Sequence, residues 1–313
     1  MAETLIGSPS LDSFLEYSAL EKKLALSTVE AYQRDLVHYL RWLSEACRDT
    51  AGTSERMADV SNASYADLAD YVSFLSSEGY SSTSIRRKLS TVRGYYRYLQ
   101  ISGLREDNPA EMMPSPRKPD RLPHAVSVDT VKAMIEVWNG DSPLSLRNRA
   151  LMELAYGAGL RESEITGMTV ARVHLDQSMV RPLGKGSKER LVPIGGAAVR
   201  WISRYLDEAR PLLACGPSTP MLFLTYRGNR LSRMTVWNIV RTSARRAGVK
   251  DKVHPHTLRH SFATHLLQGG ADLRVVQELL GHSDIRTTEI YTSVDRSWLR
   301  SVMDRYHPRS RET

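Results

Sequence analysis

Through the first hundred residues, apolar side chains recur at every third or fourth position, which is the spacing of one face of an α-helix. Four helices are predicted: one from about Leu11 to Lys23, one after a capping box formed by Ser27 and Glu30, and two that start near Ser64 and Ser82. Four short helices in this length predict a small all-α domain. We expect its aromatic residues to be core rather than base-stacking platforms: Tyr17, Tyr32, Tyr39, Tyr96 and Tyr98.

A run of prolines interrupts the helical pattern. Residues 108–124 contain Pro109, Pro114, Pro116, Pro119 and Pro123, which remove backbone donors and favour an extended strand. The predicted organisation is therefore a helical domain over 1–107, a linker over 108–124 and a second domain over 125–313. The linker also carries three basic residues, so it is either a strap that lets the domains close around a duplex or a solvated spacer.

The second domain is predicted to be mainly helical with one β element. Residues 179–183 and 190–194 are apolar-rich runs around the glycine-containing turn 184–189, a pattern typical of a β-hairpin. The whole chain is thus expected to be mainly α, with a small hairpin or sheet in its second domain.

Composition narrows the class of protein. The chain is 41% hydrophobic and 25% charged, as in ordinary soluble proteins. Cys47 and Cys215 are isolated and form neither a metal pattern nor a disulfide framework. With no signal-peptide layout and no apolar run near the ~20 residues that span a bilayer, we expect a cytoplasmic protein that makes no membrane contact.

Charge indicates a polyanionic partner. The net charge is +8, yet the first 110 residues hold 12 basic against 15 acidic side chains, so the excess lies in the second domain. One segment of the first domain, from Gly79 to Arg105, lacks any acid. Its basic residues are either a phosphate-facing surface or an ordinary solvated helix face; the candidates for DNA binding are Arg86, Arg87, Lys88, Arg93 and Arg97.

Candidate chemistry lies in four segments of the second domain. In the first, Arg161 follows two glycines and opens a helix, with Glu164 placed to support its guanidinium. The alternative is a glycine cap beside a surface arginine. In the second, Lys185 occupies the hairpin turn, where it is either solvated or a proton donor beside a phosphate.

In the third segment, His256 and Arg259 share a helix face, while Leu258 and Phe262 mark a buried one. A metal site on His256 and His260 is the weaker alternative, because no HExxH pattern or carboxylate cluster accompanies them. In the fourth, Gly281 ends a helix, His282 follows, and the next helix carries Tyr291.

Together the four segments supply two arginines, two histidines, a lysine and a tyrosine. Arginine forks offset the charge of a phosphodiester under attack. A tyrosine phenol, which titrates near ~10, needs positive surroundings to become a nucleophile. The leaving 5′ oxygen needs a general acid. This inventory suits phosphodiester cleavage without a metal or another cofactor.

The motifs GLRESEI, GKGSKERLVPIG, HPHTLRHSFATHLLQGGADLRVVQELLGHSDIRTTEIYT and the closing HPR resemble the tyrosine recombinases, and among them the bacterial Xer proteins, over nearly the whole chain. The resemblance implies a SAM-like helical core-binding domain and a catalytic domain that clamp DNA. It assigns these site residues: Tyr291 as nucleophile, Arg161 and Arg259 as phosphate clamps, His256 and His282 as phosphate ligands that move protons, Lys185 as acid, and Glu164 as support.

The resemblance also implies partners. Four protomers, of one kind or with a second Xer recombinase, act on double-stranded recombination sites, and a final helix docks in a neighbour; a septal DNA translocase is the implied regulator. The helical domain starts too near Met1 for an extra arm-binding domain, which favours a cellular recombinase that resolves chromosome dimers. The rivals are an integrase of a mobile element, a catalytically silent DNA-binding protein and a metal-dependent nuclease.

Overall fold

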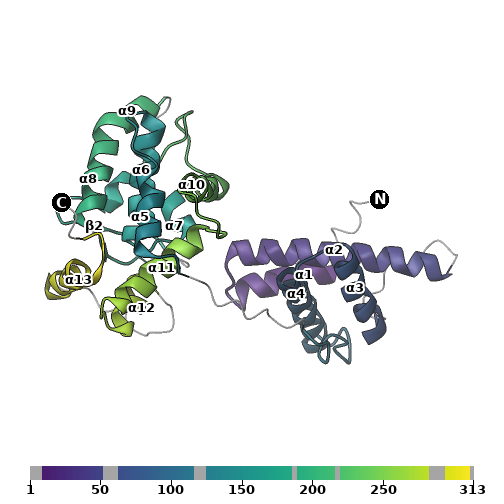
Figure 1. Cartoon of the computed structure of the whole chain (residues 1–313). Helices are drawn as coiled ribbons and strands as arrows, with labels where there is room; N and C mark the ends of the chain where they lie inside the picture. The colour runs from purple at the N-terminus through teal and green to yellow at the C-terminus, as the bar shows by residue number, and fades with distance from the viewer. Residues whose placement is uncertain are drawn as a thin grey trace. The chain divides into compact units, whose positions relative to one another are not determined.

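The chain forms two compact units, Met1–Arg121 and Leu122–Thr313, each with its own hydrophobic core (Figure 1). The computed structural model describes residues 9–51, 63–115, 125–184, 189–215, 219–281 and 293–310. Within those ranges, no helix has the length and apolar character needed to cross a membrane. The mainly α fold class is confirmed.

Unit 1 (residues 1–121) contains the four predicted helices: α1 (Pro9–Leu20), α2 (Leu26–Ala51), α3 (Tyr65–Ser77) and α4 (Ser82–Ile101). At α3 the cap is as predicted, because the Ser64 hydroxyl accepts from the Asp67 amide and the Asp67 carboxylate accepts from the Ser64 amide at 2.7 Å. The capping box at Ser27 was predicted wrongly. α2 already begins at Leu26, so Ser27 lies inside its first turn.

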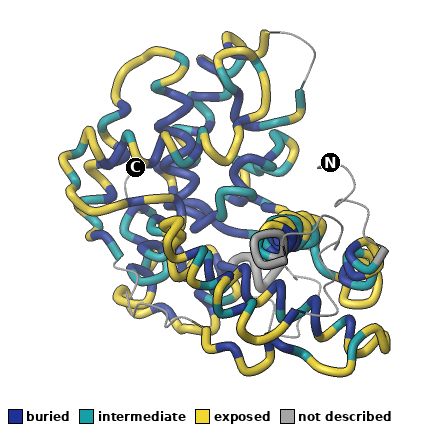
Figure 2. The backbone as a smooth tube through the Cα atoms, turned by 90° about the vertical axis from the view of Figure 1, so that its right-hand side faces the viewer, coloured by how far each residue is buried: buried dark blue, intermediate teal, exposed yellow. Residues whose placement is uncertain are grey.

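Aromatic residues fill the core of unit 1, as predicted. Tyr39 and Tyr96 are fully buried, and their hydroxyls share a hydrogen bond of 2.7 Å that satisfies both polar tips. Tyr17, Tyr32 and Tyr98 pack against the same core while partly exposed. Figure 2 shows the resulting pattern, with buried positions alternating along each helix with exposed ones.

The first residues of the predicted linker pack on this core. Ala110 and Met113 are buried in it, and the Arg93 guanidinium donates to their carbonyl oxygens at 2.9 Å in both cases. Residues 108–113 therefore belong physically to unit 1. The remainder of the predicted linker, from residue 116 to 124, lies outside the described residues.

Unit 2 (residues 122–313) is built around α6 (Pro143–Gly157), which is buried on every side from Leu146 to Gly157. Other helices pack around it, α8 and α11 among them. The remaining helical elements are α5 (Val128–Glu136), α7 (Glu162–Thr166), η2 (Val170–Arg172), α8 (Gly196–Arg204), η4 (Tyr205–Ala209), α9 (Arg210–Leu213), α10 (Arg233–Arg246), α11 (Pro255–Gln268), α12 (Leu273–Leu280) and α13 (Ser293–Tyr306).

The predicted hairpin is present, with shorter strands than expected. β2 (Met179–Val180) pairs antiparallel with β3 (Val192–Pro193), and an isolated bridge joins Leu183 to Glu189. A third strand, β1 (Val173–His174), adds to the other edge of β2. Two residues of strand leave no readable alternation, so β1 was not predicted.

The end of the chain returns to the core of unit 2. α13 packs against α11 and β3 of its own chain, with Leu299 and Met303 buried. Beyond it, His307 lies against the rings of Tyr156 and Phe262, at centroid distances of 4.9 and 5.4 Å. We call residues 307–309 the C-terminal anchor.

A buried ion pair holds the C-terminal anchor. The Arg309 guanidinium donates to both carboxylate oxygens of Glu153 in α6, at 2.8 and 2.6 Å. Arg149 lies 3.3 Å from the same carboxylate. All three side chains are buried, so the charge of Glu153 is balanced within the core.

Candidate active site

One buried carboxylate brings two of the predicted site residues together. Glu164, at the third position of α7, is 2% exposed. Its oxygens accept from the Arg161 amide at 2.8 Å and from the Arg161 guanidinium at 3.0 Å. The Arg259 guanidinium lies 3.8 Å away. Glu164 thus supports both predicted phosphate clamps, which come from segments about a hundred residues apart in the chain.

A third arginine, absent from the predicted set, completes this cluster. Arg190 donates to both oxygens of Glu164, at 2.7 and 3.0 Å, in a bidentate pair. On its own, burial would raise the pKa of Glu164. The hydrogen bonds and charge of Arg190, and then those of Arg161, outweigh burial and hold that pKa below its ordinary value. Glu164 is therefore an anion at neutral pH.

The sequence contains only a weak signal for Arg190, a charged residue at the start of the apolar-rich run 190–194. In the structure Arg190, Val192, Pro193 and Ile194 are all buried, so burial does not follow the two-residue alternation of a half-buried strand. A buried guanidinium needs an internal acid. The hairpin pattern alone does not identify Glu164 as that acid.

The carboxyl end of α12 binds all three guanidiniums. Consecutive carbonyl oxygens accept one each: Leu279 from Arg190 at 2.8 Å, Leu280 from Arg259 at 2.6 Å, and Gly281 from Arg161 at 3.4 Å. These oxygens have no partner within their helix, and the helix dipole makes them attractive to cations. The cluster therefore joins α7, α11, α12 and the strand edge at Arg190.

The two predicted clamps differ in exposure. The Arg161 side chain is 33% exposed and that of Arg259 only 8%. Burial, together with the charge of Arg161, lowers the pKa of Arg259 to about 10, so it remains protonated at neutral pH. Arg259 also donates to the Gly159 carbonyl at 2.8 Å. Since a guanidinium carries five N–H donors, each clamp keeps donors for a further anion.

Gly159 sets the approach of α11 to this cluster. Its φ of +56° is left-handed, and a Cβ there would lie 2.4 Å from the Phe262 ring. Gly159 therefore allows close approach of α11, the helix that carries His256 and Arg259.

His256 lies in the first turn of α11, which starts at Pro255 as predicted, and its side chain is exposed. The ring of His254 stands 6.4 Å from it in a T-shaped arrangement. Leu258 and Phe262 are fully buried, as predicted, but Arg259 is buried as well, whereas His256, predicted to share its face, is exposed. Among the described residues, no three His, Cys, Asp or Glu side chains are grouped so as to hold a metal ion.

Three predicted site residues, Lys185, His282 and Tyr291, lie outside the described residues. Their neighbours in sequence are nevertheless placed. Gly184 and Glu189 flank the turn that carries Lys185. Gly281, which directly precedes His282, ends α12 in a left-handed cap with φ of +67°, as predicted for that glycine.

The basic residues predicted to face DNA in unit 1 divide into two groups. Lys88 and Arg93 serve the unit itself, because the Lys88 ammonium is buried 3.5 Å from Asp35 and Arg93 binds backbone carbonyls. Arg87 also pairs with Asp35, although half of its side chain is exposed. Arg86 is half-buried and Arg97 is exposed. The acid-free stretch therefore mixes structural cations with surface ones.

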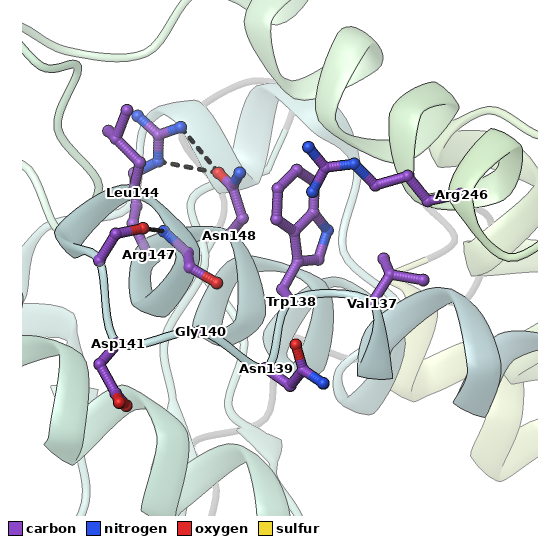
Figure 3. Close-up of a pocket in the computed structure, with 11 residues that line it drawn as sticks. Val137, Trp138, Asn139, Gly140, Asp141, Leu144, Arg147, Asn148 and Arg246 are labelled. Carbon is purple, nitrogen blue, oxygen red and sulfur yellow. Dashed lines mark hydrogen bonds between the residues drawn. The ribbon is translucent and has the colours of Figure 1, made fainter.

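A surface pocket lies elsewhere on unit 2, between the end of α5 and the start of α6 (Figure 3). Its two guanidiniums are engaged within the protein. Arg246 stacks 4.4 Å over the Trp138 ring, and Arg147 donates to Asn148 and to the Leu224 carbonyl. None of the predicted site residues lines this pocket.

Known proteins resemble both units. The phage integrase family model matches residues 125–297, and the model of the phage integrase N-terminal SAM-like domain matches residues 11–103. The tyrosine recombinase XerD of Chlorobaculum tepidum is 41% identical over 303 residues, covering 96% of each chain. That of Yersinia pestis is 42% identical over 304 residues, covering 97% of this chain and 98% of the relative.

A solved structure shares the fold. The XerH site-specific recombinase bound to its difH substrate aligns with a TM-score of 0.65 and 20% identity, over 93% of this chain and 80% of that one. The two family models and the full-length relatives define the class: the protein is a tyrosine recombinase, an enzyme that cuts and rejoins DNA strands. The chain belongs to the phage integrase family.

Proposed function

We propose that Arg161, Arg259 and His256 bind one scissile phosphate of a DNA recombination site, and that Tyr291 attacks it. The observation that carries the proposal is the cluster around Glu164. It brings two predicted clamps together on the carboxyl end of α12, one residue before His282 and ten before Tyr291. Three guanidiniums against one carboxylate leave a positive excess for a phosphate.

The reaction follows from this charge balance. The Tyr291 phenol oxygen forms a bond to phosphorus as the bond to the 5′ oxygen breaks, which leaves a 3′-phosphotyrosyl ester. His256 takes the phenol proton, and Lys185 gives a proton to the departing 5′ oxygen. His282 hydrogen-bonds the phosphate. The ester keeps the energy of the broken bond, so the 5′-hydroxyl of a partner strand reverses the step without a cofactor or metal.

The partners follow from the same chemistry and from the relatives. The substrate is a double-stranded recombination site, and strand exchange between two sites needs a tetramer, formed by this chain alone or with a second recombinase. Relatives of this length are tyrosine recombinases named XerD. We therefore assign the protein to resolution of chromosome dimers at cell division, in the cytoplasm, with a septal DNA translocase as a candidate regulator.

The decisive test is a nicked suicide substrate that traps the covalent intermediate. Tyr291→Phe is expected to bind the site with unchanged affinity and to trap no adduct, because only the nucleophilic oxygen is lost. Tyr226→Phe is a matched control on an exposed tyrosine of unit 2 and should trap adduct normally. Cleavage by Tyr291→Phe would overturn the assignment of the nucleophile.

Three further experiments test the assigned roles. Lys185→Ala should regain activity on a substrate with a better 5′ leaving group, and absence of that rescue would reassign the acid.

Full activity in excess chelator is expected, whereas loss of activity would favour a metal-dependent nuclease. Strand exchange on the host's own dimer-resolution site would separate a cellular recombinase from an integrase of a mobile element.

A further inference from the structure

We propose that Arg190 is a positioning residue for the recombination reaction: it fixes Glu164 and the end of α12 so that the two phosphate clamps keep one geometry. This inference rests on the proposed function, because it concerns the cluster assigned there to phosphate binding. Arg190 itself is not proposed to touch the DNA. Its side chain is 8% exposed and its charge is directed at a buried carboxylate.

Three contacts of Arg190 connect separate elements. Two N–H groups reach the two oxygens of Glu164, at 2.7 and 3.0 Å, and its Nε–H reaches the Leu279 carbonyl at 2.8 Å. The fork therefore fixes the plane of the carboxylate and the end of α12 at the same time. A lysine has a single ammonium and cannot make this planar set of bonds.

Packing adds a fourth constraint. Gly281 has no side chain where the stem of Arg190 passes, and a Cβ there would lie 3.0 Å from the Arg190 Cδ and 3.2 Å from Nε. Gly281 is also the residue whose carbonyl faces Arg161. The position of Arg190 is thus tied to the last residue before the segment that carries His282 and Tyr291.

Because Arg190 binds both oxygens of Glu164, it also keeps donors of Arg161 and Arg259 available for a phosphate. Arg161 bonds to Glu164 through its amide and its guanidinium, and Arg259 stands 3.8 Å away. Without Arg190, the carboxylate would turn to satisfy its oxygens from Arg161 or Arg259, and those guanidiniums would lose donors now free for a phosphate. Misplacement on this scale lowers the rate of chemistry more than the affinity for substrate.

The test is single-turnover cleavage of a suicide substrate at saturating DNA by the full chain. Arg190→Met should slow cleavage at least ~10-fold and change DNA affinity less than ~3-fold, because a positioning residue acts on the reacting geometry. Arg147→Met removes an arginine of similar burial outside the cluster. It should lower stability and leave the cleavage rate within ~2-fold. Arg190→Met cleaving at the normal rate would overturn the proposal.

A double-mutant cycle shows whether Arg190 acts through Glu164. In a Glu164→Gln background, adding Arg190→Met should slow cleavage by less than ~3-fold further, since coupled residues are not additive. Losses that multiply in full would refute the coupling. Should Arg190→Met fail to fold, Arg190→Lys keeps the charge and is expected to slow cleavage by at least ~3-fold without weakening binding. A normal rate for this variant would equally overturn the proposal.

The pH profile provides a readout that a purely structural role would not change. Within the described part of the chain, the charged groups facing Glu164 are Arg161, Arg190 and Arg259. Removing Arg190 should raise the pKa of Glu164, so the acid limb of the cleavage rate should move to higher pH in Arg190→Lys and remain in place in Arg147→Met. An unchanged acid limb in Arg190→Lys counts against the proposal.

Failure of this inference is distinguishable from failure of the proposed site. Arg161→Ala and Arg259→Ala test the site directly, and both should abolish cleavage. If they do and the Arg190 variants cleave normally, only the positioning role is refuted. If the Arg161 and Arg259 variants cleave normally, the site itself is wrong.

Discussion

His307 has the most strongly perturbed environment among the histidines that the structure describes. It is fully enclosed against Tyr156 and Phe262, and its Nδ1 accepts from the Arg309 amide at 3.3 Å. Burial, followed by the charges of His265 and Arg309, lowers the pKa of His307 to about 3. This residue is therefore neutral in the fold at any physiological pH, and a second proton on Nδ1 would break its hydrogen bond with the Arg309 amide.

That depressed pKa predicts how stability depends on pH. Between about pH 6.5 and pH 3 the unfolded chain binds a proton at His307 that the folded chain does not, so the free energy of unfolding falls as pH falls through this window. The loss should reach about 2 kcal/mol between pH 6.5 and 4.5. Urea unfolding at several pH values measures it.

His307→Phe isolates this contribution. Phenylalanine keeps an aromatic ring between Tyr156 and Phe262 and has no titratable group, so the pH dependence of its unfolding should be shallower than that of the unchanged chain. An identical slope in both proteins would mean that other groups cause the acid destabilisation.

Individual residues also show which parts of the site can be predicted from the sequence. Arg161, Glu164 and Arg259 were predicted from motif and spacing, and the structure does bring them together. Arg190 was missed because its partner lies 26 positions away and no local pattern encodes that pairing. Lys88 and Arg93 were predicted to face phosphate because charge alone does not reveal a buried partner such as Asp35.

At the scale of elements, the packing of α11 against the turn that follows α6 depends on one glycine. Gly159 has φ of +56° and a Cβ there would overlap the Phe262 ring at 2.4 Å. Gly248 has a similar φ of +70° with open space around it. A substitution at Gly248 therefore tests backbone strain alone, whereas one at Gly159 tests backbone strain together with steric overlap.

We predict that Gly159→Ala is more destabilising than Gly248→Ala by about 2 kcal/mol, because both pay for a left-handed φ and only the first also overpacks the core. The difference should appear as a lower urea midpoint for unit 2. Cleavage should fall as well in Gly159→Ala, since α11 carries Arg259. Equal losses for the two variants would show that α11 can shift without cost.

The C-terminal anchor allows a buried ion pair to be compared with an exposed one. Arg309 and Glu153 form a bidentate pair in the core, whereas Arg300 and Asp304 form an exposed pair on α13 at 3.9 Å. Removing Arg309 takes two hydrogen bonds from buried Glu153 and leaves only Arg149, at 3.3 Å, beside it, while exposed pairs contribute little.

Arg309→Ala is thus expected to lower the free energy of unfolding by about 2–3 kcal/mol, and Arg300→Ala by less than about 1 kcal/mol. Denaturant titration of both variants provides the comparison. Similar small losses would indicate that water enters and solvates Glu153 once Arg309 is gone.

Secondary structure was predictable to different degrees at this scale. The helices of unit 1 and the hairpin of unit 2 were predicted because periodicity and caps are local. The start of α2 was missed because Ser27 is a plausible cap residue, yet the helix already begins one residue earlier, at Leu26. Strand β1 was missed because pairing with β2, not its own two residues, defines it.

At the scale of the whole molecule, charge is distributed unevenly between the units. The chain carries a net charge of +8, while its first 110 residues hold more acidic than basic side chains. Within α4, Arg97 is exposed and Arg86 half-buried, whereas Lys88 is buried against Asp35. DNA affinity from unit 1 should therefore come from a few surface cations and not from its overall charge.

This distribution predicts different salt responses. Arg86→Ala and Arg97→Ala should each reduce the slope of log affinity against log salt by about 1, since each removes one phosphate contact. Lys88→Ala should leave the slope unchanged and destabilise unit 1. Fluorescence anisotropy with target DNA across salt concentrations measures all three. A reduced slope for Lys88→Ala would mean that its ammonium leaves Asp35 to bind DNA.

The carboxyl end of α12 has one more consequence. Three successive carbonyls, from Leu279, Leu280 and Gly281, each face a different arginine, and successive residues of a helix point about a hundred degrees apart. Inserting or deleting one residue within α12 would rotate every carbonyl away from its partner at once. Substitutions on the exposed side of this helix should therefore be tolerated, whereas a change in its length should not.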